Sequence, residues 1–440
     1  MAITKPELLS PAGTLKNMRY ALAYGADAVY AGQPRYSLRA RENDFDLGNL
    51  EIGINEAHQQ GKRFYVTSNL MPHNAKVKTY MADIEPVIAL GPDALIMADP
   101  GLIAMVREKW PEMPIHLSVQ ANTVNYATVK FWQSQGVERV ILSRELSLDE
   151  IAEIRQQCPD MELEVFVHGA LCIAYSGRCL LSGYFNHRDP NQGTCTNACR
   201  WDYNIQPAEV DATGDLKLAS CGDQVRHPAA DQPVLIEEGG RPGELMPMEE
   251  DEHGTYIMNS RDLRAVEHVG RLAEIGVDCL KIEGRTKSFY YAARTAQVYR
   301  QAIDDAVVGN PFDTSQLGVL EGLANRGYTD GFYQRHHTQE YQNYLEGHSK
   351  SNEQIFVGAI TRIDPDRQQA EVEVKNKFAV GDRLEIILPR GNKDVVLQDM
   401  QNLKGIAMDV APGGGHTVMI PWDAQDEQGS ELGLIARYIA

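Results

Sequence analysis

The sequence predicts a (β/α)8-like barrel followed by a small all-β domain. Over the first 285 residues, eight short apolar or β-branched runs alternate with helix-like segments, a pattern typical of a parallel α/β fold. Eight such units favour a closed TIM-type barrel over an open sheet. From Gln354 onward the pattern changes to short strands separated by tight turns, which indicates a separate β-barrel domain.

The eight apolar or β-branched runs are the predicted strands of the barrel. They are expected at Glu7–Ser10, Asp27–Ala31, Arg63–Thr67, Ala94–Ala98, Ile115–Val119, Arg139–Ser143, Leu163–Val167 and Cys279–Ile282. The helical segments between them include Thr14–Tyr24, Leu50–Gln60 and Ser147–Gln157. After the eighth strand, Ser288–Val308 has helical periodicity and is expected to complete the barrel.

The last third of the chain gives the domain boundaries. We assign residues 1–335 to the barrel, 336–353 to a polar linker and 354–440 to the C-terminal domain. Glycine- and proline-containing turns divide that domain into short strands. These are expected at Ile355–Ile360, Gln369–Val374, Arg383–Leu388, Gly405–Val410, His416–Ile420 and Leu432–Tyr438.

One interval breaks the regular spacing of the barrel strands. The first seven follow one another at about 20–30 residues, but more than 100 residues separate the seventh from the eighth. The resulting insertion, residues 169–275, follows the carboxyl end of a strand, where barrel enzymes carry their active sites. Because it begins with four of the seven cysteines, we expect those cysteines at the catalytic face.

Composition limits the compartment and the partners. The first residues lack the apolar core of a secretion signal, and no apolar run is long enough to span a bilayer, so we expect a cytoplasmic protein. The net charge of −19 opposes a nonspecific coat of nucleic acid, although a local basic patch could still recognise a folded RNA. Such a patch is suggested in the C-terminal domain by Lys375, Lys377, Arg383, Arg390 and Lys393.

The four clustered cysteines have the spacing C-x6-C-x15-C-x3-C. Each pair, Cys172 with Cys179 and Cys195 with Cys199, has a separation that could place both thiols on one face of a helix. Zinc knuckles usually use a closer first pair, which favours an iron–sulfur cluster. The alternative is that some are ordinary buried cysteines. Cys158 and Cys279 fit core positions, and Cys221 is an alternative ligand.

Several stretches resemble the collagenase-like peptidases, unclassified peptidase family thirty-two. The signature is carried by Glu164–Cys172 together with Gly177–Ser182. The resemblance extends over nearly the whole chain, and Arg188–Gly193 with Cys199–Trp201 is closest to the branch of the family that hydroxylates tRNA. Further matching stretches are Leu9–Gly13, Gly25–Tyr30, Asn259–Leu263 and Lys281–Arg285.

This resemblance implies an oxygen-independent hydroxylase rather than a protease. It implies a [4Fe–4S] cluster held by Cys172, Cys179, Cys195 and Cys199, with prephenate as oxygen donor or co-substrate. It also implies tRNA as the partner, hydroxylated at carbon 5 of the wobble uridine on the way to 5-carboxymethoxyuridine, and an electron-donor protein. Many relatives have a further cysteine where this chain has Arg264, which supports Cys199 as the fourth ligand.

Two alternatives from the same resemblance remain. Sister branches act on a ribosomal RNA cytidine or on quinone precursors, and the family name itself suggests peptidase activity. Neither an H-E-x-x-H nor a G-x-S-x-G motif occurs in the chain. Four clustered cysteines also suit metal ligation better than a single nucleophilic thiolate.

Polar residues at the ends of the predicted strands are the remaining site candidates. As catalytic residues we expect Arg144, His168, Glu283 and Arg285, and as substrate-binding residues Arg39, Arg41, Gln120 and Asn122. Arginine suits prephenate because its planar guanidinium binds a carboxylate through two hydrogen bonds. The alternative for each arginine is a salt bridge at the barrel rim, and for His168 a packed, hydrogen-bonded role. Other strand-end residues are Gln33, Tyr36, Ser68, Asn69 and Glu145, whereas Glu164 is expected in a structural ion pair.

Overall fold

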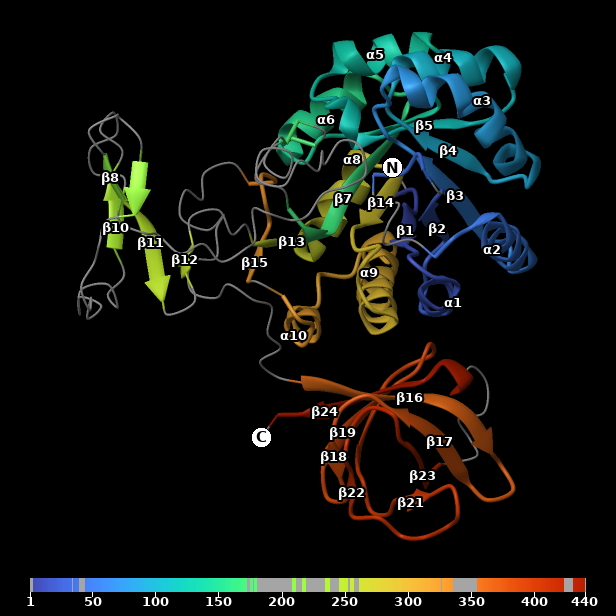
Figure 1. Cartoon of the computed structure of the whole chain (residues 1–440), viewed down its shortest axis with the longest axis vertical. Coiled ribbons are helices and arrows are strands. Elements are labelled where there is room, and N and C mark those ends of the chain that lie inside the picture. Colours follow the sequence, from blue (N-terminus) through green and yellow to red (C-terminus); the bar gives the residue numbers. More distant parts are fainter. Residues whose placement is uncertain are drawn as a thin grey trace.

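The computed structural model confirms the predicted fold class. It describes residues 3–33, 35–38, 44–171, 175–176, 178–179, 261–325, 327–334, 354–422 and 430–439, and the strand backbone at 208–210, 216–218, 234–237, 245–251 and 254–256. A closed barrel of eight parallel strands forms the larger part, and a separate antiparallel domain, orange to red in Figure 1, lies beneath helices α1 and α9. Within these residues no helix has both the length and the apolar character that crossing a membrane would require.

The barrel strands follow the chain order around the barrel. Each strand pairs in parallel with the next, and the last, β14, pairs with both β1 and β7, which closes the barrel. The strands are β1 (Glu7–Pro11), β2 (Ala28–Gly32), β3 (Arg63–Ser68), β4 (Ala94–Met97), β5 (Ile115–Leu117), β6 (Arg139–Ile141), β7 (Glu162–Ala170) and β14 (Cys279–Ile282).

Helices cover the outside of the barrel (Figure 1). Most start at a residue whose side-chain oxygen accepts a hydrogen bond from the first turn, as Thr14 does for α1 and Ser288 for α9. The helices are α1 (Leu15–Ala23), α2 (Leu47–Gln59), α3 (Asn74–Ala89), α4 (Pro100–Lys109), α5 (Tyr126–Ser134), α6 (Leu148–Gln157), α8 (Val269–Ile275), α9 (Phe289–Val308) and α10 (Ser315–Glu321). Short 3-10 helices are η2 (Val119–Ala121), η6 (Val266–His268) and η8 (Ser430–Leu432).

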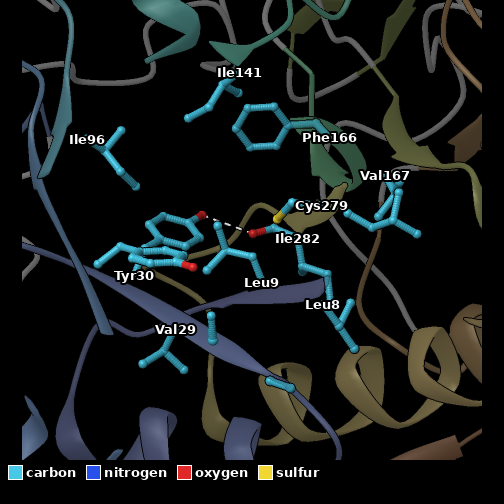
Figure 2. Close-up of a cluster of buried hydrophobic side chains, with 14 of the residues drawn as sticks. Leu8, Leu9, Val29, Tyr30, Ile96, Ile141, Phe166, Val167, Cys279 and Ile282 are labelled. Atoms are coloured by element: carbon cyan, nitrogen blue, oxygen red, sulfur yellow. Dashed lines mark hydrogen bonds between the residues drawn. The ribbon is translucent and has the colours of Figure 1, made fainter. Parts of the chain in front are cut away.

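Side chains alternate between the inside of the barrel and the helical layer. In Figure 2, Tyr30, Ile96, Ile141 and Phe166 point into the space enclosed by the strands, whereas Val29 points toward the helices. All five are buried, and the Tyr30 hydroxyl donates to the backbone oxygen of Ile282 at 3.0 Å. The middle of the barrel is therefore an apolar core rather than a channel.

The amino-terminal end of the barrel is closed by a network of charges. Fully buried Glu164 accepts from Lys281 Nζ at 2.7 Å and from Arg139 Nη1 at 3.3 Å. Arg139 also donates to Glu7 at 2.7 Å and through Nε to Glu162 at 2.8 Å. The structural ion pair predicted for Glu164 is thus confirmed, and it lies at the end of the barrel where polar residues serve stability.

Strand β7 continues past its partner β14 and carries an additional edge. Its last residues pair antiparallel with β13 (Asp262–Arg264), which pairs in turn with β15 (Tyr328–Thr329). Two groups of antiparallel strands lie in the chain between β7 and β13. In the first, β8 (Ala208–Val210) pairs with β9 (Leu216–Leu218). In the second, β11 (Leu245–Asp251) pairs with both β10 (Val234–Glu237) and β12 (Gly254–Tyr256). Most of the predicted cysteine-rich insertion lies outside the described residues and stays a prediction.

The C-terminal domain is an antiparallel β structure. Its strands are β16 (Gln354–Asp364), β17 (Gln369–Val374), β18 (Phe378–Ala379), β19 (Arg383–Ile387), β20 (Lys393–Val396), β21 (Gln401–Asn402), β22 (Val410–Ala411), β23 (Thr417–Pro421) and β24 (Leu434–Tyr438). The strand predicted at Gly405–Val410 is wrong, because Gly405 has φ 76° in a tight turn closed by hydrogen bonds to Asn402. The linker predicted at 336–353 lies outside the described residues.

Polar and aromatic contacts join the C-terminal domain to α1 and α9. The Arg294 guanidinium, 1% exposed, forms an ion pair with Glu385. Tyr24 donates to the backbone oxygens of Ile387 and Leu432 at 2.8 and 2.9 Å. The Phe356 ring stacks on Tyr290 with 4.5 Å between centroids. The domain is therefore attached by buried contacts as well as by the chain.

Candidate functional site

Arg285 lies at the carboxyl end of the barrel, directly after β14. Its Nη1 donates to Ser37 Oγ at 2.7 Å and to Thr67 Oγ1 at 2.9 Å. The guanidinium lies 5.9 Å from the centre of the Tyr30 ring. Since Arg285 is only 8% exposed and is held by two hydroxyls, its orientation at the barrel mouth is fixed before any ligand arrives. Ser37 and Thr67 were not among the predicted site residues. Along β3 every second side chain, such as Tyr65 and Thr67, points into the barrel, and this alternation could have identified Thr67.

Two glycines of the signature stretches let the loops at the mouth approach closely. A Cβ atom on Gly13 would lie 2.0 Å from the backbone oxygen of Arg285. A Cβ on Gly169, which has φ 107°, would lie 2.5 Å from the backbone oxygen of Glu283. Any side chain at either position would push the loop after β14 away from β1 or β7, so glycine is required there.

Arg144 reaches the same face from the loop after β6. Its guanidinium carbon lies 3.9 Å from the centre of the Phe166 ring, which points into the barrel. Half-buried and stacked on an aromatic face, Arg144 is placed to meet an anionic ligand, so two predicted arginines, Arg144 and Arg285, lie at the mouth.

Asn122 connects the end of β5 to the segment that carries Cys179. It has φ 52°, and its Nδ2 donates to the backbone oxygens of Gln120 at 2.8 Å and Ser176 at 2.7 Å. The backbone N–H of Arg178, the residue before Cys179, donates to the backbone oxygen of Tyr175 at 3.1 Å. Asn122 was predicted to bind substrate, but these contacts indicate that it positions the cysteine-bearing segment.

Replacing Asn122 with aspartate is expected to loosen this attachment. A carboxylate cannot donate and would face two carbonyl oxygens, so the Ser176 segment should separate from η2. We expect the Cys179 thiol to react at least about threefold faster with a small alkylating reagent in the metal-free protein, measured by mass spectrometry. Asn125→Asp is the matched control, because Asn125 caps α5 through its Oδ1 and aspartate caps equally well. Equal alkylation of both variants would contradict the positioning role.

The cysteines separate into two classes. Cys279 is completely buried in the barrel core, and this burial raises the pKa of its thiol well above the usual range. Cys158 ends α6, where its Sγ donates to the backbone oxygen of Tyr126 at 3.6 Å. Both are core residues, as predicted. Cys179 is half-buried, three residues after Ser176, whose backbone oxygen accepts from Asn122; it is therefore not a core residue like the other two.

Three of the four predicted ligands, Cys172, Cys195 and Cys199, lie outside the described residues, as does the alternative Cys221. Within the described part of the chain, no three His, Cys, Asp or Glu side chains come together as a metal site. The chemistry of Cys179 fits an iron ligand, and the complete four-cysteine site stays a prediction. Arg39 and Arg41 also lie outside the described residues.

His168 is not at the barrel mouth, so its predicted placement is wrong. Its ring lies behind β7, 5.4–5.7 Å from the rings of Tyr291, Tyr299 and Tyr328. Its Nδ1 contacts the Tyr299 hydroxyl at 3.3 Å, and that hydroxyl also donates to Val167. Burial lowers the pKa of His168 to about 3, so the ring is neutral at physiological pH. His168 therefore has the packed, hydrogen-bonded role that was the alternative to a catalytic one.

The depressed pKa of His168 predicts a loss of stability in acid. As the pH falls below about 6.5, the unfolded chain binds a proton at this residue while the folded protein does not, until the pH approaches 3. His168 should therefore lower the free energy of unfolding by about 1.4 kcal/mol for each pH unit in this window. Urea unfolding at several pH values should show a shallower pH dependence for His168→Phe, and identical slopes would contradict the assignment.

The other strand-end residues have mainly local roles. Tyr36 donates to Asp83 at 2.7 Å and so anchors its loop on α3. Asn69 donates to Ser118 Oγ at 3.2 Å, which links the ends of β3 and β5. Glu283 is 8% exposed, and its backbone oxygen accepts from Tyr291 at 2.8 Å. Gln120 has a buried Oε1 without a protein partner at the mouth, so it remains a candidate for binding substrate.

The chain is similar in sequence to two family models and to several known proteins. The model of peptidase family U32 matches residues 13–343, and that of the family's C-terminal domain matches residues 352–432. A tRNA hydroxylation protein P of Escherichia coli (strain K12) is 65% identical over 95% of this chain and 94% of its own length. A protein of the same name from Haemophilus influenzae is 60% identical over 94% and 93%. An Escherichia coli 23S rRNA 5-hydroxycytidine synthase is 28% identical over 87% of this chain and 53% of that protein.

Proposed function

Because the chain belongs to peptidase family U32 and carries the family's C-terminal domain, we propose that it is an RNA-modifying enzyme that hydroxylates tRNA. The observation that carries this proposal is the similarity, along nearly the full length of both chains, to two tRNA hydroxylation proteins. The finer proposal is hydroxylation of the wobble uridine at carbon 5, the first step toward 5-carboxymethoxyuridine. Prephenate would be the oxygen donor or co-substrate.

The proposed cofactor is a [4Fe–4S] cluster on Cys172, Cys179, Cys195 and Cys199. When bound, such a cluster supplies electron transfer or Lewis acidity close to the substrate. Support from the described residues is that Cys179 is half-buried and follows by three residues Ser176, whose backbone oxygen accepts from Asn122 after the end of β5. Cys158 and Cys279 are removed as ligands because both are packed in the core.

The two arginines give the mouth its proposed role in binding prephenate, which is a dicarboxylate. Arg285 is held by Ser37 and Thr67, and Arg144 by the Phe166 ring. A guanidinium with a fixed orientation loses little freedom when it binds a carboxylate. We assign Arg144 and Arg285 to the co-substrate, and Gln120, whose buried Oε1 has no protein partner, to substrate binding.

The test is nucleoside analysis of tRNA from a strain lacking the gene, grown without oxygen so that oxygen-dependent hydroxylation cannot mask the loss. We expect 5-hydroxyuridine derivatives to disappear and to return when the gene is restored. Unchanged tRNA nucleosides in the anaerobic deletion strain would overturn the proposal. If hydroxycytidine in 23S rRNA were lost instead, the enzyme would be a ribosomal RNA hydroxylase like its more distant relative.

The family name also prompts a peptidase assay. We expect no cleavage of collagen or unfolded peptides by the iron-loaded protein. Cleavage that persists after iron removal and stops on alkylation of thiols would favour a cysteine peptidase instead.

A further inference from the structure

The loop that carries Arg144, between β6 and α6, is held at both of its ends. At its start, the backbone N–H of Leu142 donates to the backbone oxygen of Glu164 at 2.9 Å. At its end, the backbone N–H of Leu148, the first residue of α6, donates to the backbone oxygen of Tyr333 at 3.2 Å. The N–H of the first helical residue has no partner within its own helix. The end of the Arg144 loop is therefore fixed by Tyr333, which follows β15 and lies outside the eight barrel strands and their helices.

The Tyr333 hydroxyl also fixes the residue on which the Arg144 guanidinium lies. It donates to the backbone oxygen of Phe166 at 2.6 Å, and the centre of the Phe166 ring lies 3.9 Å from the guanidinium carbon of Arg144. Tyr333 is 8% exposed, and burial raises the pKa of its hydroxyl, so the hydroxyl stays protonated and continues to donate. The Arg144 charge opposes this rise in the pKa, which indicates that the guanidinium lies near Tyr333 as well as on Phe166.

The segment that carries Tyr333 is itself anchored to the barrel. Directly before it, β15 pairs with β13. Within it, Asp330 Oδ2 lies 3.2 Å from His268 Nε2, and the His268 ring forms a T-shaped contact with the Tyr333 ring, with 5.9 Å between ring centres. The Tyr333 ring is therefore packed in one orientation before any ligand binds.

A second tyrosine forms an equivalent hydrogen bond beside the first. Tyr299 of α9 donates to the backbone oxygen of Val167, the residue after Phe166, at 2.7 Å. The register between β7 and β14 shifts here, and backbone groups left out of regular pairing need other partners. Burial raises the pKa of Tyr299, and the arginine whose charge opposes this rise is Arg264. Tyr299 therefore shares the structural role of Tyr333 but lies apart from the arginine that is stacked on Phe166.

We propose that Tyr333 is a positioning residue, which holds Arg144 in the orientation that binds a carboxylate of the co-substrate. This inference rests on the proposed function, in which Arg144 and Arg285 bind prephenate, and it adds to that site a residue from outside the barrel repeat. Arg285 is held directly by Ser37 and Thr67, whereas Arg144 is held through the ring and the loop that Tyr333 fixes. A side chain that is already ordered loses less freedom when a ligand binds. Without the Tyr333 hydroxyl, the ring and the loop gain freedom, so binding of the carboxylate becomes weaker.

The test measures binding of prephenate to the anaerobically purified full-length protein by titration calorimetry. Tyr333→Phe removes only the hydroxyl and should raise the Kd about fivefold, because the guanidinium must then be ordered when the ligand binds. Tyr299→Phe is the matched control, because it removes the hydrogen bond to the next backbone oxygen of the same strand, and it should bind prephenate like the wild type. Thermal unfolding of both variants checks that they are folded at the temperature of the titration.

Combination with Arg144→Gln separates positioning from a general structural effect. Arg144→Gln alone should raise the Kd about tenfold, since Arg285 remains to bind the ligand. If Tyr333 acts through Arg144, adding Tyr333→Phe to Arg144→Gln should raise the Kd no further. In tRNA hydroxylation, Tyr333→Phe should raise the KM for prephenate and leave kcat unchanged, because the lost contact serves binding.

The remaining outcomes separate this inference from the proposed function. Equal Kd values for Tyr333→Phe and Tyr299→Phe would overturn the positioning role and leave the proposed function standing, and so would a further loss of about fivefold when Tyr333→Phe is added to Arg144→Gln. A wild type that does not bind prephenate but restores tRNA hydroxylation in the deletion strain would remove the co-substrate assignment and this inference with it. A wild type that does neither would remove the proposed function itself.

Discussion

Replacing Cys179 with alanine is expected to remove most of the iron from the anaerobically purified protein and to lower tRNA hydroxylation by more than about a hundredfold. Changes to residues that only support metal ligands already cost 10- to 100-fold in affinity or activity, so loss of a ligand should cost more. Iron and sulfide analysis, together with nucleoside analysis of complemented deletion strains, would measure both effects.

The matched control for this experiment is Cys158→Ala. Cys158 is 2% exposed at the end of α6, and its Sγ donates to the backbone oxygen of Tyr126 in α5, so its loss should reduce stability slightly and leave iron content unchanged. A Cys179→Ala protein that retains the iron and sulfide of the wild type would remove Cys179 from the proposed ligand set. A loss of iron in both variants would indicate unfolding rather than ligation, and thermal unfolding of the two proteins distinguishes these cases.

Glu164→Gln should produce the largest loss of stability from a single exchange of nearly equal volume. The change leaves the Lys281 ammonium buried without its carboxylate and removes one of the partners of Arg139. Removing one partner of a buried ion pair costs about 3–5 kcal/mol, because the remaining charge stays out of water. Burial already lowers the pKa of Lys281, which shows that this charge depends on its partner.

The neighbouring residue Glu162 supplies the control. It pairs with the same arginine at 2.8 Å, but its side chain is 49% exposed. An exposed pair contributes about 0–1 kcal/mol, so Glu162→Gln should unfold at nearly the wild-type urea concentration. Adding Lys281→Met to Glu164→Gln should recover part of the lost stability, since the unpaired ammonium is then gone. Equal losses in Glu164→Gln and Glu162→Gln would contradict the importance of burial.

The barrel could be predicted from the sequence because its signal is local and repeated. Strand β3 was expected at Arg63–Thr67 and occupies Arg63–Ser68, and α9 was expected at Ser288–Val308 and occupies Phe289–Val308. Apolar strands and amphipathic helices each have a period that a short window of sequence reveals. The pairing of β13 with the free edge of β7 could not be predicted, because β13 has only three residues, too few to show the alternation of apolar and polar side chains that marks a strand.

His168 shows how an alternating pattern fails. Counting alternate residues from Glu164 and Phe166 places His168 inside the barrel. The register between β7 and β14 shifts, however, so that Lys281 is opposite Phe166 while Ile282 is opposite His168. The irregularity leaves Val167 as an extra residue and reverses the faces of everything after it. No composition or spacing in the sequence marks this position. Arg144 and Arg285 lie at the mouth as expected, because that placement depends only on their following the ends of β6 and β14.

The way the C-terminal domain is attached determines how the molecule comes apart. Separating it from the barrel would expose the Phe356 and Tyr290 rings to water, and would break the Tyr24 hydrogen bonds and the Arg294–Glu385 ion pair. Each of these losses is unfavourable in water. We therefore expect the barrel and the C-terminal domain to unfold in one cooperative transition, and neither could be exchanged for another domain without rebuilding the surface of the other.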